Sequence, residues 1–379
     1  MYQIKFLKPL LLSKNLGAVN KKLRPNDLIY ELSSTITITN DLGEQFFYGH
    51  ATISIEARLY FNNDKSKVNQ KFEVISIENI KWTPGKRAID IKIFVPFNKL
   101  PAESYVSLYA HLNLSSETID ELNYGNVSTE ELIQDTIGDK GNVFEGVKYS
   151  NLIKWDNLQF FPTSTDYIKI PKVLDELPLK SDRLALRQVG RSLLFEELSG
   201  SIARHLWDAG ILINLLPEDE FLRFTEFEKK EKLTILELGT GIGLVSIHLG
   251  EIFSNAEIIA TDLDDAREIC QQNISLNLLS KSIKFEELDW ESDKKSENDW
   301  DLIVVTDCTY NPLYYDALIN VMEVESNRNT KIALVHKFRE PFSESEFFSK
   351  VSRYFNIEKQ SWYNINGSTL IHMGLYTRK

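Results

Sequence analysis

Hydrophobic and polar residues follow two different patterns along the chain, and the change falls near residue 180. In HATISIEARLYF every second residue from Ala51 to Phe61 is apolar, and RAIDIKIFVPF repeats this alternation from Ile89 to Phe97. A period of two predicts half-buried strands. The turn signal Thr-Pro-Gly between KFEVISIENIKW and RAIDIKIFVPF predicts that these two strands form a hairpin. The polar stretch 115–146 predicts one or two short helices with loops.

From about residue 180 onward, apolar stretches of strand length alternate with amphipathic stretches of helix length. The predicted strands are 191–198, 232–239, 256–263, 282–290, 301–310 and 331–337, and the predicted helices are 205–216, 243–253, 265–277, 314–324 and 345–355. This alternation predicts a parallel, doubly wound sheet. The last two strands, FNIEKQSWY and TLIHMGLYTR, are joined only by NING and must be antiparallel. We therefore expect a Rossmann-like seven-stranded sheet with an antiparallel last hairpin at 181–379, after a strand-rich α+β accessory domain at 1–180.

Composition and charge narrow the classes of partner. The chain has 379 residues, which is long for one core, and its 42% hydrophobic and 26% charged content is ordinary for globular domains. No run of 18 apolar residues occurs, so we expect no membrane span. Two cysteines cannot make a disulfide framework, which favours the cytoplasm or the nucleus. The net charge of −12 disfavours nucleic acid and favours a basic protein or a small molecule.

A glycine-rich loop in ILELGTGIGLVSI is the strongest chemical signal. A strand runs into Gly239, Thr240, Gly241 and Gly243, and a helix follows. Glycines let the backbone turn tightly and approach a ligand closely. Position 244 is Leu, so the GxGxxG pattern of dinucleotide sites fails, and the GK[ST] of a phosphate-binding loop is missing.

Two acids near this loop indicate which ligand it binds. Glu237 lies two residues before the first glycine, where it would repel a pyrophosphate and attract the ammonium group of S-adenosylmethionine. Asp262 ends the next strand and can accept hydrogen bonds from both ribose hydroxyls. Asp264 and Asp265 compete for the ribose, but we expect them to cap the following helix. The alternative, an inert glycine-rich turn, does not explain Glu237 and Asp262 together.

Five short motifs occur in the order HLWDAG (205–210), ELGTGIG (237–243), TDL (261–263), LDW (288–290) and DCTY (307–310). Together they resemble the seven-β-strand protein lysine methyltransferases of methyltransferase family 16, from about residue 185 to the end of the sequence. The resemblance implies a class I fold, S-adenosylmethionine as cofactor, and cofactor contacts at Trp207, Gly239, Thr240, Gly241, Asp262, Trp290 and Thr306. Some relatives have Ala at the position of Thr306. Trp290 can stack on adenine and Asp289 can accept from its amino group, although both tryptophans could instead be core aromatics.

The substrate side is expected at the end of the strand 301–310. There a carboxylate, Asp307, can grip an incoming ammonium, and the ring of Tyr310 can shield it by a cation–π contact. These two are the candidate catalytic residues, with a cap of the next turn as the alternative for Asp307. No general base is assigned, although His336 is a candidate.

Several alternatives remain open at this point. NPLY (311–314) resembles the [DN]PP[YF] of enzymes that methylate the amino group of adenine or glutamine, but DCTY occupies that slot. Histidine methylation, nucleic-acid amino-group methylation and a non-catalytic interaction protein stay possible. The resemblance implies a protein substrate such as an elongation factor, ribosomal protein or chaperone. We expect lysine methylation on the translation machinery, a monomer, and no metal.

Overall fold

The computed structural model describes residues 2–15, 29–41, 43, 45–61, 71–113, 152–153, 160–161, 163–171, 178–181, 185–197, 201–229, 232–292, 298–339, 341–365 and 369–379. The helices expected within 115–146 lie outside these residues. The chain divides into two compact units: Met1–Asn123 with Asn157–Gln188 and Leu193–Gly200, and Tyr124–Asp156 with Val189–Ser192 and Ser201–Lys379. The domain boundary at 180/181 stays a prediction.

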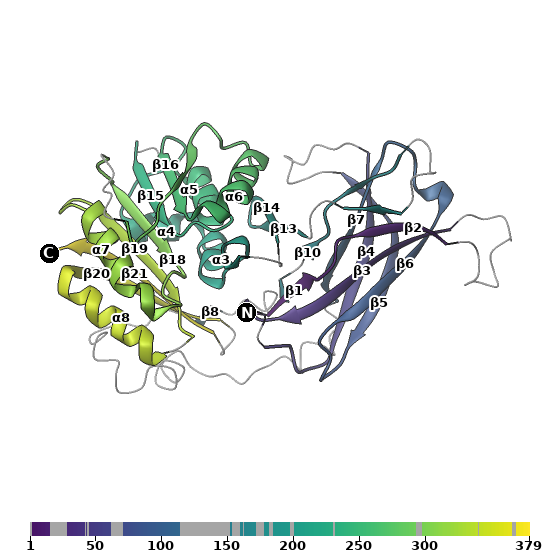
Figure 1. The fold of residues 1–379 in the computed structure, drawn as a ribbon, viewed down its shortest axis with the longest axis horizontal. Coiled ribbons are helices and arrows are strands. Elements are labelled where there is room, and N and C mark those ends of the chain that lie inside the picture. The colour runs from purple at the N-terminus through teal and green to yellow at the C-terminus, as the bar shows by residue number, and fades with distance from the viewer. Residues whose placement is uncertain are drawn as a thin grey trace. The chain divides into compact units, whose positions relative to one another are not determined.

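The first unit is built from two sheets (Figure 1). One has the order β12-β2-β3-β1-β9, with β6 also paired to β3; the other has the order β14-β13-β10-β7-β4-β5, with β11 also paired to β7. The strands are β1 (Tyr2–Phe6), β2 (Leu11–Asn15), β3 (Ile29–Thr39), β4 (Ala51–Tyr60), β5 (Phe72–Trp82), β6 (Ile89–Pro96), β7 (Tyr105–Leu112), β9 (Phe160–Phe161), β10 (Thr163–Ser164), β11 (Ile168–Lys169), β12 (Leu179–Lys180), β13 (Ala185–Val189) and β14 (Ser192–Glu196).

The alternation seen in the sequence buries one face of each sheet in a shared core. Ile36 of β3 and Ile93 of β6 pack in one cluster with Ile55 of β4 and Leu108 of β7. The expected hairpin of β5 with β6 is wrong, because β5 pairs with β4 and β6 pairs with β3. Both strands bury side chains in the same core from opposite sheets, so the turn between them carries the chain across the core instead of along one sheet.

The second unit contains the predicted doubly wound sheet. Its order is β17-β16-β15-β18-β19-β21-β20-β8; the five strands from β17 to β19 are parallel, and β21 is antiparallel to both neighbours. Seven of the eight strands expected after residue 180 lie in this sheet, and β8 adds a short eighth. The remaining expected strand, 191–198, is β14, which pairs in a sheet of the first unit instead. The strands of the doubly wound sheet are β8 (Leu152–Ile153), β15 (Thr234–Leu238), β16 (Glu257–Asp262), β17 (Ile283–Glu287), β18 (Leu302–Thr306), β19 (Lys331–Lys337), β20 (Phe355–Ile365) and β21 (Thr369–Arg378).

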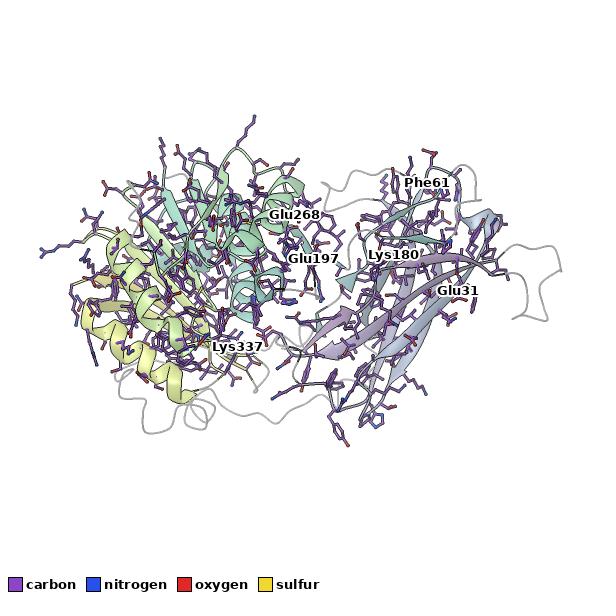
Figure 2. All side chains as sticks on the ribbon, in the orientation of Figure 1. Glu31, Phe61, Lys180, Glu197, Glu268 and Lys337 are labelled. Carbon is purple, nitrogen blue, oxygen red and sulfur yellow. The ribbon has the colours of Figure 1, made fainter. Side chains whose placement is uncertain are left out.

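Helices cover both faces of this sheet (Figure 1), and side chains fill the space between the layers (Figure 2). Alternate strand residues such as Leu236, Ile303 and Leu334 form one cluster with Leu318 of α7 and Phe347 of α8. In the part of the chain that the structure describes, no helix combines the length and apolarity needed to span a membrane. The helices are α3 (Asp208–Leu215), α4 (Glu218–Thr225), α5 (Leu244–Ile252), α6 (Asp264–Leu276), α7 (Tyr315–Glu325) and α8 (Pro341–Tyr354).

Candidate functional site

A cavity of about 320 Å³ opens at the carboxyl ends of β15, β16 and β18. The chain reverses its strand order at this place, since β15 has β16 on one side and β18 on the other. Such a switch point is where open α/β sheets bind ligands. The cavity is lined by eleven of the twelve residues selected from the sequence: Trp207, Glu237, Gly239, Thr240, Gly241, Asp262, Asp289, Trp290, Thr306, Asp307 and Tyr310.

The glycine loop is shaped by close packing. Gly239 has a φ of 72°, and a Cβ there would lie 2.5 Å from the Sγ of Cys308 and 3.4 Å from the indole of Trp290. Such a contact is too short for any side chain, and the backbone angle also favours glycine. Gly243 lies outside the cavity lining and begins α5, where a Cβ would be 3.0 Å from Sγ of Cys270. Gly243 therefore allows close packing of the loop against Cys270 of α6, on the side away from the cavity lining.

Glu237 lines the cavity, and one of its two carboxyl oxygens has no hydrogen-bond partner. Its side chain is buried, and Oε2 accepts hydrogen bonds from Thr240 Oγ1 (2.7 Å), Ser246 N (3.0 Å) and Ser246 Oγ. Oε1 has no hydrogen-bond partner. Burial raises the pKa of Glu237 to about 7, although the bonds from Ser246 and Thr240 act to lower it. A buried carboxylate oxygen without a donor fits the ammonium group of S-adenosylmethionine, which brings both charge and donors.

Asp262 faces the same cavity from the end of β16. Its Oδ2 accepts from Gly241 N and its Oδ1 from Leu263 N, both at 2.8 Å, which leaves lone pairs for two further donors such as ribose hydroxyls. Asp264 and Asp265 lie in the first turn of α6, where acids suit the helix dipole as expected, but neither is the N-cap residue: that position is Leu263, which makes no side-chain cap hydrogen bond. Asp265 lines the cavity instead.

Residues before α3 were missed by the sequence analysis. Ser201, Ile202, Ala203, His205 and Leu206 line the cavity together with Trp207. The Ala203 carbonyl lies 3.1 Å from the position of a Cβ on Gly241, so this segment packs directly on the glycine loop. Trp207 holds the segment, because its Nε1 donates to the Ile202 carbonyl at 3.3 Å. No periodicity marks these residues; only their position just before the Trp-Asp motif could have indicated them.

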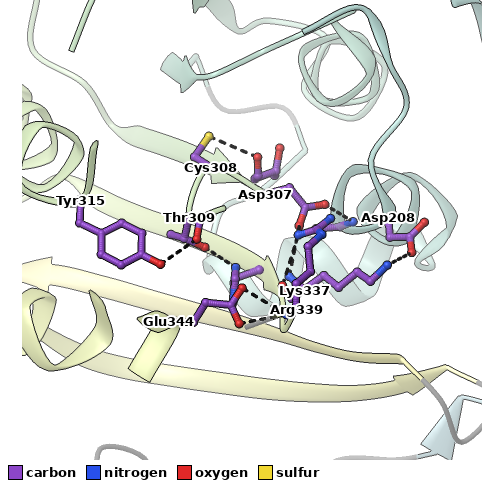
Figure 3. A network of polar contacts seen from close by, with 11 residues as sticks. Asp208, Asp307, Cys308, Thr309, Tyr315, Lys337, Arg339 and Glu344 are labelled. Atoms are coloured by element: carbon purple, nitrogen blue, oxygen red, sulfur yellow. Dashed lines mark hydrogen bonds and ion pairs between the residues drawn. The ribbon is translucent and has the colours of Figure 1, made fainter. Parts of the chain in front are cut away.

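Asp307 is engaged with the protein itself (Figure 3). Its buried carboxylate accepts from Ala209 N (2.7 Å), Lys337 N (3.2 Å) and Arg339 Nη1 (2.8 Å). Burial acts to raise the pKa of Asp307, but the charge and hydrogen bonds of Arg339 hold it below its usual range, so the carboxylate is ionised. Three donors of the protein already occupy this carboxylate, so the grip on an incoming ammonium that the sequence suggested stays a prediction.

Further buried polar groups lie beside Asp307 in Figure 3. Lys337 Nζ donates to Asp208 Oδ2 at 2.7 Å, and the backbone N–H of Arg339 donates to Glu344 Oε2 at 2.9 Å. His336 is buried, its Nδ1 is hydrogen-bonded to the Thr309 hydroxyl, and it does not line the cavity. His336 is therefore not placed to act as a base on a ligand in the cavity.

Tyr310 is half-exposed at the cavity, three residues after Asp307. Burial of the hydroxyl, followed by the neighbouring Cys308 and Asp262, raises the pKa of Tyr310 to about 12. Tyr310 thus remains a neutral phenol at physiological pH. Asp289, Trp290 and Thr306 complete the lining that the sequence predicted.

Comparisons with known proteins give one family match and several similar chains. Residues 191–354 match the family described as lysine methyltransferase. The chain is 25% identical over 334 residues to a UPF0665 family protein of Schizosaccharomyces pombe, covering 86% of this chain and 89% of that protein. It is 26% identical over 259 residues to the protein-lysine N-methyltransferase EFM2 of Saccharomyces cerevisiae, covering 64% of this chain and 57% of that protein. The structure of a SAM dependent methyltransferase from Aquifex aeolicus aligns with a TM-score of 0.34 and 14% identity, covering 42% of this chain and 90% of that one.

Proposed function

We propose that this chain, an S-adenosylmethionine-dependent methyltransferase resembling the protein lysine methyltransferases, transfers a methyl group to a lysine ε-amine of a protein. The charge of the cavity carries this proposal. Among the described residues that line it, none is Lys or Arg. A lining of this sign attracts a cationic side chain and repels phosphate groups. The acidic lining residues are Glu237, Asp262, Asp265, Asp289, Glu291 and Asp307.

The same lining fits the cofactor. When bound, S-adenosylmethionine supplies a methyl group on a sulfonium that its own positive charge has already activated. The free oxygen of Glu237 would hold the ammonium group, and Asp262 would hold the ribose. Trp290 and Asp289 would bind the adenine. We propose that Gly239, Thr240, Gly241 and Gly243 shape the loop that holds the cofactor. Trp207 and Thr306 would line the cavity beside this loop.

The acceptor amine would meet Tyr310. A neutral aromatic ring at the cavity can hold a cation by its face and exclude water while the amine approaches. Asp307 acts through its neighbours, because its bonds to Ala209 and Arg339 fix the loop on which Tyr310 stands. We assign no side chain as general base, so the amine would lose its proton to water before transfer.

Nucleic-acid methylation is disfavoured by a second observation. The side-chain oxygen of Asn311 accepts from the backbone N–H of Leu313 at 3.1 Å and so caps the short 3₁₀ helix Pro312–Tyr314. This oxygen is used within the protein, whereas the rival interpretation of NPLY needs it to face a nucleobase. A histidine acceptor suits the acidic cavity less well than lysine, because its ring is mostly neutral at physiological pH.

We further propose that the target belongs to the translation machinery, because members of the family that the chain resembles modify translation factors, ribosomal proteins and chaperones. Lysate from cells lacking the protein would be incubated with purified chain and radioactive S-adenosylmethionine, and labelled bands analysed by mass spectrometry. We expect methyl-lysine on an elongation factor or a ribosomal protein, and no label with Asp262→Ala. Methyl-histidine, or label only in nucleic acid, would overturn the lysine assignment; methyl-lysine on an unrelated protein would overturn the translation target alone.

A further inference from the structure

Large apolar side chains stand exposed around the cavity. Four of them line it, and Leu313 lies in sequence between two of these, Tyr310 and Tyr314. The side chain of Leu313 is 85% exposed, the highest value among the exposed large hydrophobic residues of the described chain. Exposed apolar side chains gathered at one place mark interaction sites, whereas scattered ones are ordinary. We call this set the apolar rim: Ile202, Leu263, Tyr310, Leu313 and Tyr314.

The position of Leu313 is fixed by the backbone. The Asn311 side chain accepts from Leu313 N at 3.1 Å, and the Asn311 carbonyl accepts from Tyr314 N at 3.1 Å. Pro312 stands at the first turn of the 3₁₀ helix, where its ring presets φ. A capped turn that holds a leucine outward has its conformation ordered before any partner arrives. Such a preformed apolar contact costs less entropy on binding than a mobile loop would.

The acidic cavity and the apolar rim together favour a ligand that carries both a positive charge and an apolar group. The acidic cavity attracts a cationic side chain, and the apolar rim beside it offers nothing to a second charge. Resting on the proposed function, we propose that the apolar rim binds a large apolar side chain next to the acceptor lysine of the substrate protein. The preferred substrate segment therefore has Leu, Ile, Phe or Met within about two residues of the lysine, and no acidic residue there.

Other occupants fit these observations less well. Phosphates of nucleic acids and anionic lipid headgroups meet carboxylates at the cavity that the rim surrounds. A second copy of the chain would bring a net charge of −12 to the same acids. A lysine flanked by an apolar residue satisfies both parts of the surface at once.

The test uses fluorescent peptides of one design, an alanine and serine background with a central lysine flanked by Leu, Phe, Ser or Asp. Binding to the full chain saturated with S-adenosylhomocysteine is measured by polarisation, and methylation with S-adenosylmethionine by mass spectrometry. Leu313→Ser is compared with Leu278→Ser, because Leu278 is also exposed (73%) but lies after α6, outside the cavity lining. Both variants should bind S-adenosylhomocysteine like the wild type, which shows that they are folded.

We expect the wild type to bind Leu- and Phe-flanked peptides about fivefold to tenfold more tightly than Ser-flanked ones, as one apolar contact allows. Leu313→Ser should lose this preference and Leu278→Ser should keep it. Equal binding of all flanks by the wild type, or an unchanged preference in Leu313→Ser, overturns the inference while methylation of lysine leaves the proposed function intact. A wild type that binds cofactor but methylates no lysine in any peptide overturns the proposed function and the inference with it. Self-association that Leu313→Ser abolishes would assign the rim to a second copy instead.

Discussion

Glu237 combines a charge with a position from which water is excluded. In the folded chain without ligand, burial raises the pKa of Glu237 to about 7, from an ordinary value of about 4.3. Between these two pH values the folded state therefore binds a proton that the unfolded state has lost. Stability of the ligand-free protein should therefore fall as pH rises through this window, because the folded state binds more protons than the unfolded one. The ammonium group of a ligand requires the ionised form, so ligand affinity should change in the opposite sense.

We predict that affinity for S-adenosylhomocysteine falls as the pH is lowered from 8 to 6, approaching about tenfold per unit below pH 7 as one proton must be released. Isothermal titration at several pH values measures this. Glu237→Gln should bind more weakly and without this pH dependence. Glu257→Gln, at an exposed carboxylate paired with Lys232, should keep it. Equal pH dependence in both variants would show that another group titrates.

Tyr310 can act through its ring or through its hydroxyl, and two substitutions separate them. We predict that Tyr310→Phe keeps most of kcat, since the ring face remains, and that Tyr310→Ala loses about tenfold or more. Methylation kinetics on the peptides described above measure this, with cofactor affinity near normal in both variants. If phenylalanine is as damaging as alanine, the hydroxyl does the work and the cation–π account fails.

At the scale of elements, Asp307 joins three of them. It follows β18, accepts from the first turn of α3 through Ala209, and accepts from the end of β19 through Lys337 N and the Arg339 side chain. Its φ of 53° lies in the left-handed region, which costs a non-glycine residue free energy unless such bonds compensate. Without these bonds, the loop that carries Tyr310 would lose its attachment to α3.

We predict that Asp307→Asn destabilises the second unit by about 3 kcal/mol, because the nearly buried Arg339 loses its ion pair with Asp307. Asparagine tolerates the left-handed conformation, so backbone strain cannot explain a loss. The measurement is chemical denaturation, following the transition that S-adenosylhomocysteine shifts. The control Asp316→Asn removes an exposed partner of Lys350 and should cost under about 0.5 kcal/mol. If Asp307→Asn lowered the rate of methylation without lowering stability, Asp307 would instead contact the acceptor amine directly.

At the scale of the whole molecule, the described lining of the cavity comes from residues between Ser201 and Tyr314. The first unit contributes a separate core made by two sheets. We propose that the domain boundary lies near 180/181 and that the N-terminal domain recognises or orients the protein substrate.

A truncated chain of residues 181–379 should then bind S-adenosylhomocysteine with the affinity of the full chain and methylate its whole protein substrate more slowly. Some stability is expected to be lost, because β8 pairs with Asn364 and Ile365 at the sheet edge and is removed. Calorimetric titration with S-adenosylhomocysteine shows whether the truncated chain is folded. Slower methylation by a chain that binds this ligand normally then reports a loss of substrate recognition. A folded truncated chain with full activity on the whole substrate would contradict the recognition role.

The sequence by itself determined most elements of the second unit and their order, but it missed α4 and β8 and assigned the strand 191–198 to the wrong sheet. Strand and helix periods are local properties, so β19 was predicted at its observed bounds, and the short NING connection required β20 and β21 to be antiparallel. The glycine loop, Glu237 and Asp262 could be selected as candidates because ligand chemistry restricts residue types at fixed spacing from a strand end, and all of these but Gly243 line the cavity. For such residues, the position relative to a sequence motif is enough to select them as candidates.

Only the tertiary structure decided which groups are engaged and which are free. Asp307 and Glu237 are both buried acids at strand ends, yet Arg339 and backbone donors engage both oxygens of the first while one oxygen of the second has no partner. Partner choice of this kind depends on groups about thirty residues or more away in sequence, which no periodicity encodes. The pairing of β5 with β4 instead of β6 has the same origin, because burial in a common core favoured opposite sheets over the neighbouring strand.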